Sequence, residues 1–232
     1  MTRKRSTSTV HGVRPPQIPT ALPPAPAPIL ITDQTTYSGV TLTDADLSAT
    51  HAEDVTLDQT VCRRVRLTQA ELIRLQLTDV QLDTCDLAGA TLTRAEFRRV
   101  AFLGCRLLGA ALLDARLDDV RVQRSNGEAL RCWGATLRAV RFERCALRSA
   151  SFAGSTLNGV VFHDCDLTGA DFREASLRGA DLRGSTLTGV QVGLRELQGV
   201  IVSPTQAAEL AGLLGLIVTA EERDAEDGGR DA

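Results

Sequence analysis

A five-residue period constrains this chain more than any other feature of its sequence. Between Leu42 and Val202, the large apolar side chains that anchor the repeats sit at positions whose numbers end in 2 or 7, and no insertion shifts this register. A period of five fits neither the 3.6-residue turn of an α-helix nor the two-residue alternation of a β-strand. We therefore expect the chain to turn a corner in every repeat.

Two further phases of the period support this interpretation. Two residues before each anchor lies a small or medium-sized side chain, with Arg195 as the clear exception, and all six Phe and all six Cys fall at these two phases. Twelve of the nineteen glycines share the phase two residues after the anchor, where a tight turn would use their relaxed φ. With aromatics at only 3% of the chain, the interior is expected to be narrow.

Segments such as Cys85 to Gly89, Ala90 to Arg94 and Ala180 to Gly184 resemble the A(D/N)LXX unit of the bacterial pentapeptide-repeat proteins, and the resemblance covers residues 35–202. It implies an all-β fold, a right-handed quadrilateral β-helix in which four pentapeptides form one coil and two of every five side chains point inward. Thirty-three centres between 42 and 202 imply about eight coils. At ~4.8 Å per coil, the rod would be roughly 40 Å long.

Composition divides the chain into four parts. Seven of the eight prolines lie between Pro15 and Pro28, and acidic residues dominate the C-terminal end. Such segments favour extended or solvated chain over a packed core. The predicted parts are a disordered Pro-rich tail at 1–34, the β-helix at 35–202, a capping α-helix at 203–218 and a disordered acidic tail at 219–232.

The predicted helix begins with a recognisable cap. Ser203 suits the N-cap, Pro204 the first helical position and Gln206 the third position of a capping box. The helix is apolar nearly all round, so one face should seal the last coil, and the other is either a homodimer surface or is covered by the chain's own tail. The candidate dimer and cap residues are Leu210, Leu213, Leu214, Leu216 and Ile217.

Outward-facing apolar residues in the middle of the rod suggest a partner surface, because exposed apolar patches mark interfaces. Leu113 and Trp133 are twenty residues apart and should stack, whereas Ser125, Gly127 and Leu130 match the repeat poorly. Two interpretations remain open, a bulged coil that forms a partner site and a local packing of Trp133 over Gly127. The candidate partner surface comprises Leu103, Leu108, Leu113 and Trp133.

No motif for catalysis or for a cofactor stands out. His11, His51 and His163 lie far apart and lack partners at motif spacing, and no P-loop or paired-carboxylate motif occurs. The pairs Cys85/Cys105 and Cys145/Cys165 should stack on adjacent coils, which would allow disulfides or a metal ladder. Without CxxC spacing, core packing in a reducing cytoplasm is the favoured interpretation. We expect no enzyme activity, metal or cofactor.

Charge bears on the choice of partner. The formal net charge is -3, and residues 35–202 hold 21 Asp and Glu against 20 Arg, a net of -1. In the pentapeptide-repeat family, quinolone-resistance and toxin-immunity members resemble B-DNA in size and negative charge and bind DNA gyrase; such a mimic should be more acidic than this rod. Outward charges alternate in sign at twenty-residue steps, which predicts a charge ladder along one face. Its members are Asp46, Arg66, Asp86 and Arg106.

The sequence therefore predicts a cytoplasmic, non-enzymatic interaction or scaffold protein with an unassigned protein partner. The alternative is a DNA-mimic-type protein that binds gyrase or topoisomerase and confers resistance to quinolones or gyrase toxins. Nucleic-acid binding is disfavoured, and no apolar stretch is long enough to predict a membrane span.

Overall fold

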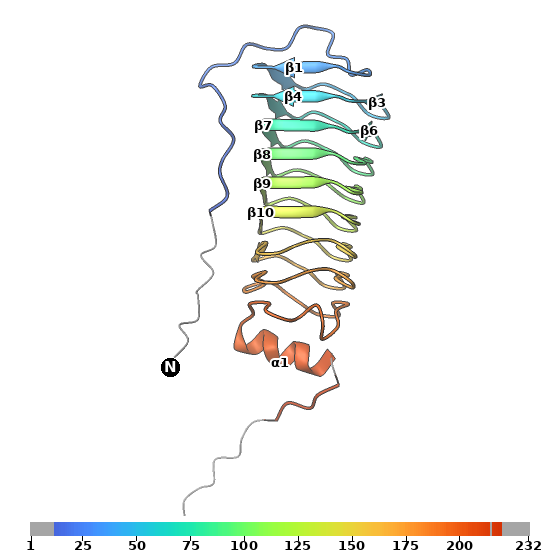
Figure 1. The fold of residues 1–232 in the computed structure, drawn as a ribbon. Coiled ribbons are helices and arrows are strands. Elements are labelled where there is room, and N and C mark those ends of the chain that lie inside the picture. The colour runs from blue at the N-terminus through green and yellow to red at the C-terminus, as the bar shows by residue number, and fades with distance from the viewer. Residues whose placement is uncertain (1–11, 214, 220–232) are drawn as a thin grey trace, which may run out of the picture.

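The protein is a rod of stacked coils with a short helix at one end (Figure 1). The computed structural model describes residues 12–213 and 215–219. Along the rod, each paired residue lies beside the residue twenty positions later, as in Leu57 with Leu77 and Leu77 with Phe97, and every strand pair is parallel. Since twenty residues are four pentapeptides, the predicted four-cornered β-helix with a C-terminal helix is confirmed.

Eleven short strands form two parallel sheets among the described residues. The larger sheet follows the order β1-β4-β7-β8-β9-β10-β11, with β2 and β5 beside it, and β3 pairs with β6 in the smaller one. The strands are β1 (Thr36–Ser38), β2 (Thr41–Thr43), β3 (His51–Glu53), β4 (Thr56–Asp58), β5 (Val61–Arg63), β6 (Glu71–Ile73), β7 (Gln76–Asp83), β8 (Glu96–Leu103), β9 (Arg116–Gln123), β10 (Thr136–Glu143) and β11 (Val161–His163).

The strands define fewer coils than the eight predicted. Seven strands lie on the long path, and the six steps between them correspond to about six turns. Beyond β11 the stacking continues only through single bridges, the last joining Asp181 to Ile201. The reason is local: most corners after Leu147 are closed by a β-turn hydrogen bond, such as Val160 N to Leu157 O at 3.1 Å, which leaves each side of the coil too short to count as a strand.

The interior contains the two predicted phases. One continuous cluster of buried side chains runs from Ile31 to Leu210 and includes all six Phe and all six Cys. Phe142 and Phe162 stack with ring centroids 5.0 Å apart, and Phe152 and Phe172 stack at 5.3 Å. Every fifth residue, at numbers ending in 4 or 9, has a positive φ along most of the rod, whether it is glycine or not. Each pentapeptide thus contributes one corner of the coil, which explains the period of five.

The irregular coil at Gly127 is not bulged. Gly127 N donates to Ala146 O at 2.7 Å, and Leu107 N donates to Asn126 O at 2.6 Å, so the twenty-residue register continues unchanged. A Cβ on Gly127 would lie 2.9 Å from Leu147 Cδ2 and 3.6 Å from Leu130. Leu147 and Leu130 therefore fill the space that the anchor side chain usually takes, and the predicted packing of Trp133 over Gly127 is wrong.

The C-terminal helix α1 spans Pro204–Leu213 and lies across the end of the rod (Figure 1). The capping box is formed: Ser203 N donates to Gln206 Oε1 at 2.9 Å, and Gln206 N donates to Ser203 Oγ at 3.3 Å. The helix ends earlier than the predicted Val218, because Gly215, with a φ of 82°, donates to Gly212 O while Leu216 N donates to Ala211 O. This pair of bonds is a Schellman motif, which stops a helix.

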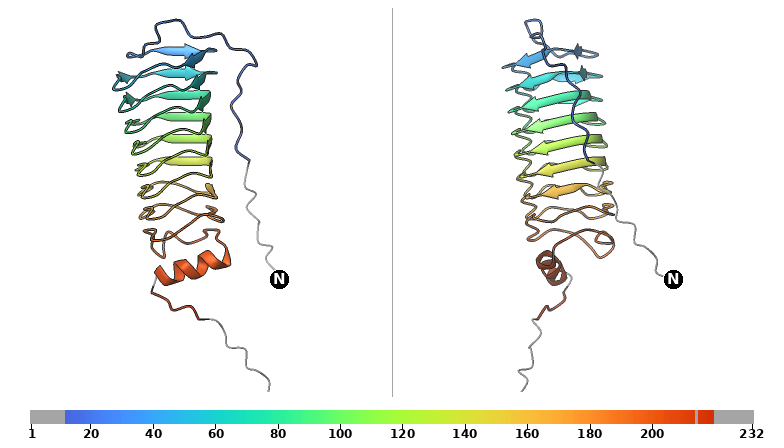
Figure 2. Two further views of the ribbon diagram at one scale, coloured as in Figure 1. Left: turned by 180° about the vertical axis from the view of Figure 1, so that it is seen from behind. Right: turned by 90° about the vertical axis from the view of Figure 1, so that its left-hand side faces the viewer.

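The Pro-rich N-terminal segment is extended but not unpacked, so that part of the prediction is wrong for the described residues. Residues 12–31, here called the strap, run along one side of the rod (Figure 2). Arg14 binds Asp119, Gln17 N donates to Asp79 at 2.8 Å, and the strap pairs with Thr41 through backbone hydrogen bonds of 2.8 Å. Ile31, 8% exposed, covers the interior of the first coil. The strap packs because the rod offers buried carboxylates to its polar groups.

Some predicted features lie outside the described residues. These are residues 1–11, Leu214 and nearly all of the predicted acidic tail, from 220 to 232. Within the described ranges, no helix has the length and apolar character of a membrane span. The same part of the chain holds no group of three or more His, Cys, Asp or Glu that could hold a metal ion.

Candidate interaction surfaces

Charge ladders decorate the N-terminal half of the rod. Arg66 contacts Asp46 at 2.7 Å and Arg106 contacts Asp86 at 3.3 Å, which confirms the ladder predicted from the twenty-residue spacing. Further pairs follow the same rule, with each Arg bound to the Asp one coil earlier. They are Arg64 with Asp44, Arg74 with Asp54 and Arg99 with Asp79. Stacking therefore neutralises most of the charge on these coils.

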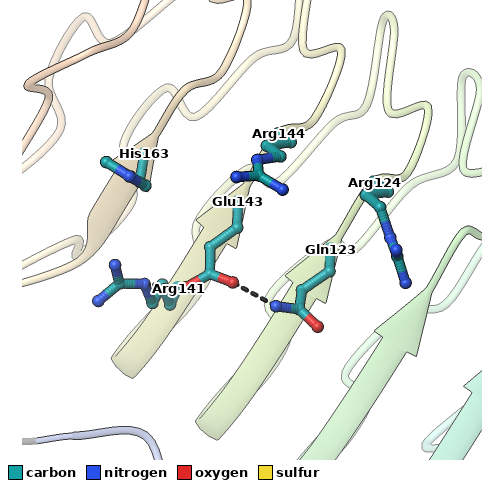
Figure 3. Close-up of a pocket in the computed structure, with 6 residues that line it drawn as sticks. All are labelled: Gln123, Arg124, Arg141, Glu143, Arg144 and His163. Atoms are coloured by element: carbon teal, nitrogen blue, oxygen red, sulfur yellow. Dashed lines mark hydrogen bonds and ion pairs between the residues drawn. The ribbon is translucent and has the colours of Figure 1, made fainter.

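The coils around β9, β10 and β11 break this rule. Arg121 pairs directly with Arg141 across the sheet, and Arg124 is followed one coil later by Arg144. Three of these four arginines, Arg124, Arg141 and Arg144, line a groove of about 410 Å³ (Figure 3). We call it the arginine groove, and it is lined by Gln123, Arg124, Arg141, Glu143, Arg144 and His163. Three guanidinium groups against one carboxylate give its lining a formal charge of +2.

One carboxylate lies at the centre of the arginine groove. Gln123 Nε2 donates to Glu143 Oε2, and Arg141 Nε contacts Glu143 Oε1 as an ion pair without the alignment of a hydrogen bond (Figure 3). Burial opposes ionisation of Glu143, but the hydrogen bond from Gln123 and the positive charges of Arg141 and Arg121 hold its pKa below the ordinary value. Glu143 is therefore ionised at neutral pH and satisfies part of the groove's positive charge.

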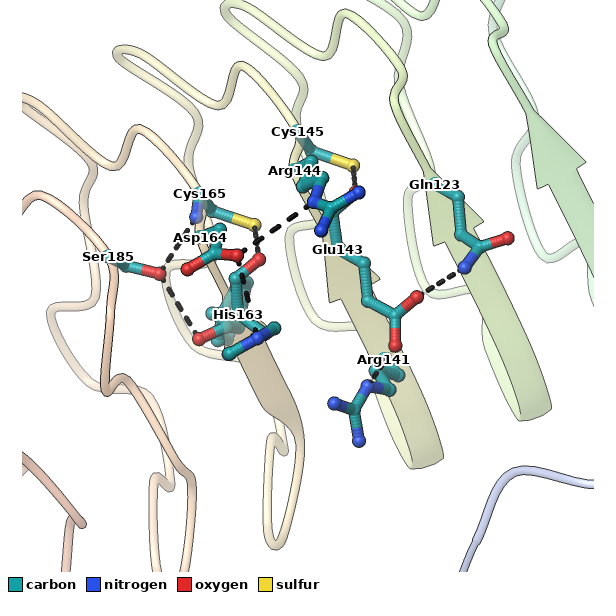
Figure 4. A network of polar contacts seen from close by, with 10 residues as sticks. Gln123, Arg141, Glu143, Arg144, Cys145, His163, Asp164, Cys165 and Ser185 are labelled. Atoms are coloured by element: carbon teal, nitrogen blue, oxygen red, sulfur yellow. Dashed lines mark hydrogen bonds and ion pairs between the residues drawn. The ribbon is translucent and has the colours of Figure 1, made fainter.

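The remaining cations of the arginine groove are weakly held. Arg144 approaches Asp164 only to 3.9 Å, and its side chain is 73% exposed. Arg124 makes no hydrogen bond or ion pair with its side chain among the described residues. Below the outer layer, Cys145 and Cys165 donate to the carbonyl oxygens of Glu143 and His163, which fixes the backbone that carries the groove (Figure 4).

The thiols form an internal ladder that the sequence showed only as spacing. All six cysteines are free and buried. Cys85, Cys105 and Cys145 each donate to a carbonyl oxygen one coil earlier at 3.4 Å. Burial raises the pKa of Cys132 to about 12, so this thiol stays protonated. These contacts agree with the core-packing interpretation.

The predicted partner surface is not one patch. Leu103, Leu108 and Leu113 are half-buried and lie on three successive sides of the same coil. Trp133 is 50% exposed, and its indole Nε1 donates to Ser151 Oγ at 2.7 Å. Asp114 N donates to Trp133 O, so Leu113 and Trp133 lie on adjacent coils of the same side. The structure brings together only these two of the four predicted residues.

The C-terminal helix has two distinct faces. Leu210 is buried at 5% exposure, and buried Gln206 donates from Nε2 to Leu182 O and Ser185 O, both at 2.7 Å, which closes the last coil. The other candidate residues that the structure describes are exposed. They are Leu213, Leu216 and Ile217, and Leu214 lies outside the described residues.

The arginine groove and the strap were missed by the sequence reasoning. The signal for the groove was present, because Arg121 and Arg141, like Arg124 and Arg144, are twenty residues apart. A comparison of all outward residues twenty apart for like charges, as well as for opposite ones, reveals this groove. The signal for the strap was weaker, since nothing in a Pro-rich segment shows which corner of the rod it contacts.

Comparison with known families agrees with the geometry. Residues 75–152 match a family model described as a pentapeptide repeat region, and residues 150–189 match one described as pentapeptide repeats in eight copies. The chain belongs to the pentapeptide-repeat family. No curated protein matches it.

Several solved structures are similar to this chain. HetL, a pentapeptide repeat protein involved in heterocyst differentiation regulation from the cyanobacterium Nostoc, is 20% identical, covers 73% of this chain and 90% of its own, and has a TM-score of 0.38. Full-length QnrB1, a plasmid-mediated fluoroquinolone resistance protein, is 19% identical, with 80% and 97% covered and a TM-score of 0.33. At such TM-scores, these similarities carry no inference about function.

Proposed function

We propose that this protein is a non-enzymatic scaffold that binds a protein partner through the outer surface of its rod. Pentapeptide-repeat proteins are generally structural or interaction proteins, and the rod has a rigid, regular exterior. The observation that supports the proposal most is Trp133. It is half exposed beside Leu113, whereas all six Phe are buried. A large aromatic side chain held at the surface is typical of the centre of an interface.

Two properties follow from the same proposal. Six free buried thiols suit a reducing compartment such as the cytoplasm. The exposed apolar side chains of Leu213, Leu216 and Ile217 at the end of the rod suit a homodimer. Light scattering at micromolar concentration tests the dimer: we expect twice the chain mass, reduced to one chain mass by Ile217→Glu, and a single chain mass for the unchanged protein rejects the dimer.

Affinity capture tests the scaffold function. The full chain should retain a specific partner, Trp133→Ala should lose it, and Leu194→Ala should keep it. Leu194 is a matched control because it is 71% exposed and lies about three coils from Trp133 along the rod. Equal capture by all three proteins would reject Trp133 as the recognition residue, and no specific partner for any of them would reject the function.

Topoisomerase protection is the alternative function, and a supercoiling assay separates it from the proposal. The rod is nearly neutral and carries the arginine groove, which is the opposite of what a DNA mimic requires. We expect micromolar protein to leave gyrase supercoiling unchanged with and without a fluoroquinolone. Inhibition of gyrase, or its protection from the drug, would favour the alternative.

A further inference from the structure

We infer that the arginine groove binds a carboxylate-rich, extended segment of a protein partner, an inference that rests on the proposed scaffold function. Its arginines come from two adjacent coils, Arg124 from one and Arg141 and Arg144 from the next. Guanidinium groups recognise carboxylates through paired hydrogen bonds, so such a cluster matches an acidic peptide in both charge and geometry.

Residues twenty apart stack on successive coils and form a column along the rod. The column that contains Arg124 shows why these cations need an outside partner. Earlier in the same column, Arg64 is held by Asp44 at 2.6 Å. Arg124 instead follows Gly104 and precedes Arg144, so neither stacked neighbour is acidic. Like charges stacked on adjacent strands repel each other. An acidic ligand would relieve this repulsion, which the ladder pairs in the N-terminal half of the rod avoid by alternating signs.

The neighbouring column repeats the arrangement. Arg121 and Arg141 are direct partners in the sheet, and Ala101 and Val161 flank them in the adjacent coils. The Nε atom of Arg121 is buried without a hydrogen-bond acceptor among the described residues, whereas that of Arg141 has its ion-pair contact with Glu143. Glu143, which contacts Arg141, shows that a carboxylate fits in the groove, but one carboxylate cannot neutralise the three arginines of its lining.

The strap shows how an extended chain is recognised by this rod. Arg14 binds Asp119 while Gln17 binds Asp79, so three residues of the strap span two coils. An extended segment rising ~3.1 Å per residue covers about 9.3 Å in three residues, close to the roughly 9.6 Å of two coils. The arginines of the groove lie only one coil apart, ~4.8 Å, so carboxylates on every second residue of an extended partner, about 6.2 Å apart, come nearest to their spacing.

A peptide is favoured over a nucleic acid as the occupant. The groove spans only a few coils, and Asp164 and Asp181 lie beside it, the latter lining the adjoining hollow that shares Arg141 and His163. A phosphate backbone would meet these carboxylates, and the rod as a whole is not basic. A short segment can place its carboxylates on the arginines alone.

Fluorescence anisotropy with the full chain tests the inference. The probe is a labelled peptide in which Glu alternates with Pro, and the matched probe carries Lys in place of Glu. The double variant Arg124→Gln with Arg144→Gln removes two groove cations. The control, Arg64→Gln with Arg66→Gln, removes two cations that Asp44 and Asp46 already neutralise.

We expect the Glu peptide to bind at low salt and the Lys peptide not to bind. The groove variant should weaken binding roughly tenfold or more, as expected for lost charge-assisted hydrogen bonds, and the control should change it less than about twofold. No binding of the Glu peptide, an equal loss in the control variant, or tighter binding of a DNA duplex than of the peptide would overturn the inference. If partner capture is unchanged by the groove variant and the peptide fails to bind, the groove is rejected while the scaffold function stands.

Discussion

One corner of the rod is built in two different ways along its length. At residues 79, 99 and 119 it is Asp, Arg and Asp, with φ values of 54°, 52° and 56°, inside strands that pass through the corner. At residues 159 and 179 the same corner is glycine, with φ values of 72° and 73°. The first version uses side chains to hold a backbone conformation that the second obtains without them.

This difference shows that outward-facing side chains can stabilise a corner whose position is already set by the packing of the interior. A residue other than glycine in the left-handed region costs roughly 1–2 kcal/mol. In the first version, Arg99 binds Asp79 through two hydrogen bonds of 2.6 and 2.5 Å, and the strap adds Arg14 on Asp119. These contacts offset the backbone strain and cover the corner. In the glycine version, Gly159 and Gly179 are half-buried, and the described residues of the strap make no hydrogen bond to them.

The largest effect is expected where the interiors of the two regions differ. Phe162 is fully buried, stacks on Phe142 and meets two further rings edge-on, whereas the one aromatic ring paired with Phe102 among the described residues is that of Phe97. Phe162→Ala should lower the free energy of unfolding by about 3–5 kcal/mol. Phe102→Ala should cost about 1 kcal/mol less, because fewer ring pairs are lost. Urea unfolding measures both, and a smaller loss for Phe162→Ala than for Phe102→Ala contradicts this account of the interior.

The next effect concerns the ion pair at the strand corner. The side chains of Arg99 and Asp79 are only 12% and 7% exposed. Arg99→Gln leaves a buried carboxylate without its charged partner and should cost about 3 kcal/mol at pH 7. Arg66→Gln, in an exposed ladder pair, should cost less than about 1 kcal/mol in the same assay. Equal costs would show that burial of the corner pair adds nothing.

The same variant has a defined pH dependence. The hydrogen bonds from Arg99 hold the pKa of Asp79 below its ordinary value, so the pair stabilises the fold fully above the unfolded-chain pKa of about 3.9. This contribution is lost as the pH falls through the lower folded-state pKa. The stability difference between the unchanged protein and Arg99→Gln should therefore shrink at acidic pH, and a difference that grows would contradict the assignment.

The smallest effect is expected when residues are exchanged between the two versions of the corner. No atom lies within 4 Å of a Cβ built on Gly159, so Gly159→Ala should cost only the left-handed backbone term, about 1 kcal/mol. Ala139, at the same corner one coil earlier with a φ of 49°, should gain up to about 1 kcal/mol as Ala139→Gly. Thermal unfolding of the pair checks this, and shifts of the same sign would show that φ does not set the difference.

The interior of the rod could be predicted from the sequence because every pentapeptide repeats the same requirement. Leu87 and Phe162 sit at one phase and Cys85 at the other, and each is buried where the period places it. Gly127 shows the limit of this prediction. The space of its missing side chain is filled by Leu130, at the other inward phase, and by Leu147 from the next coil, which a rule applied to single positions cannot detect.

The exterior was predictable only where residues twenty apart were compared. The ladder through Asp46 and Arg66 follows from this comparison, whereas a rule for opposite charges alone does not find the stacking of Arg124 on Arg144. The position of the strap depends on a few contacts, chiefly that of Arg14 with Asp119, which are 105 residues apart and follow no repeat. Such single, long-range contacts leave no periodic trace in the sequence.

The central claim is that the chain advances by one coil for every twenty residues. Pulsed electron paramagnetic resonance tests it with nitroxide labels on Ser48→Cys paired with Glu128→Cys or with Arg148→Cys, since all three positions are exposed on one column and the native thiols are buried. At ~4.8 Å per coil, we predict separations of about 19 Å and 24 Å, with the second longer by one coil. Equal distances for the two pairs, or a broad distribution centred far beyond 24 Å, would contradict the coil.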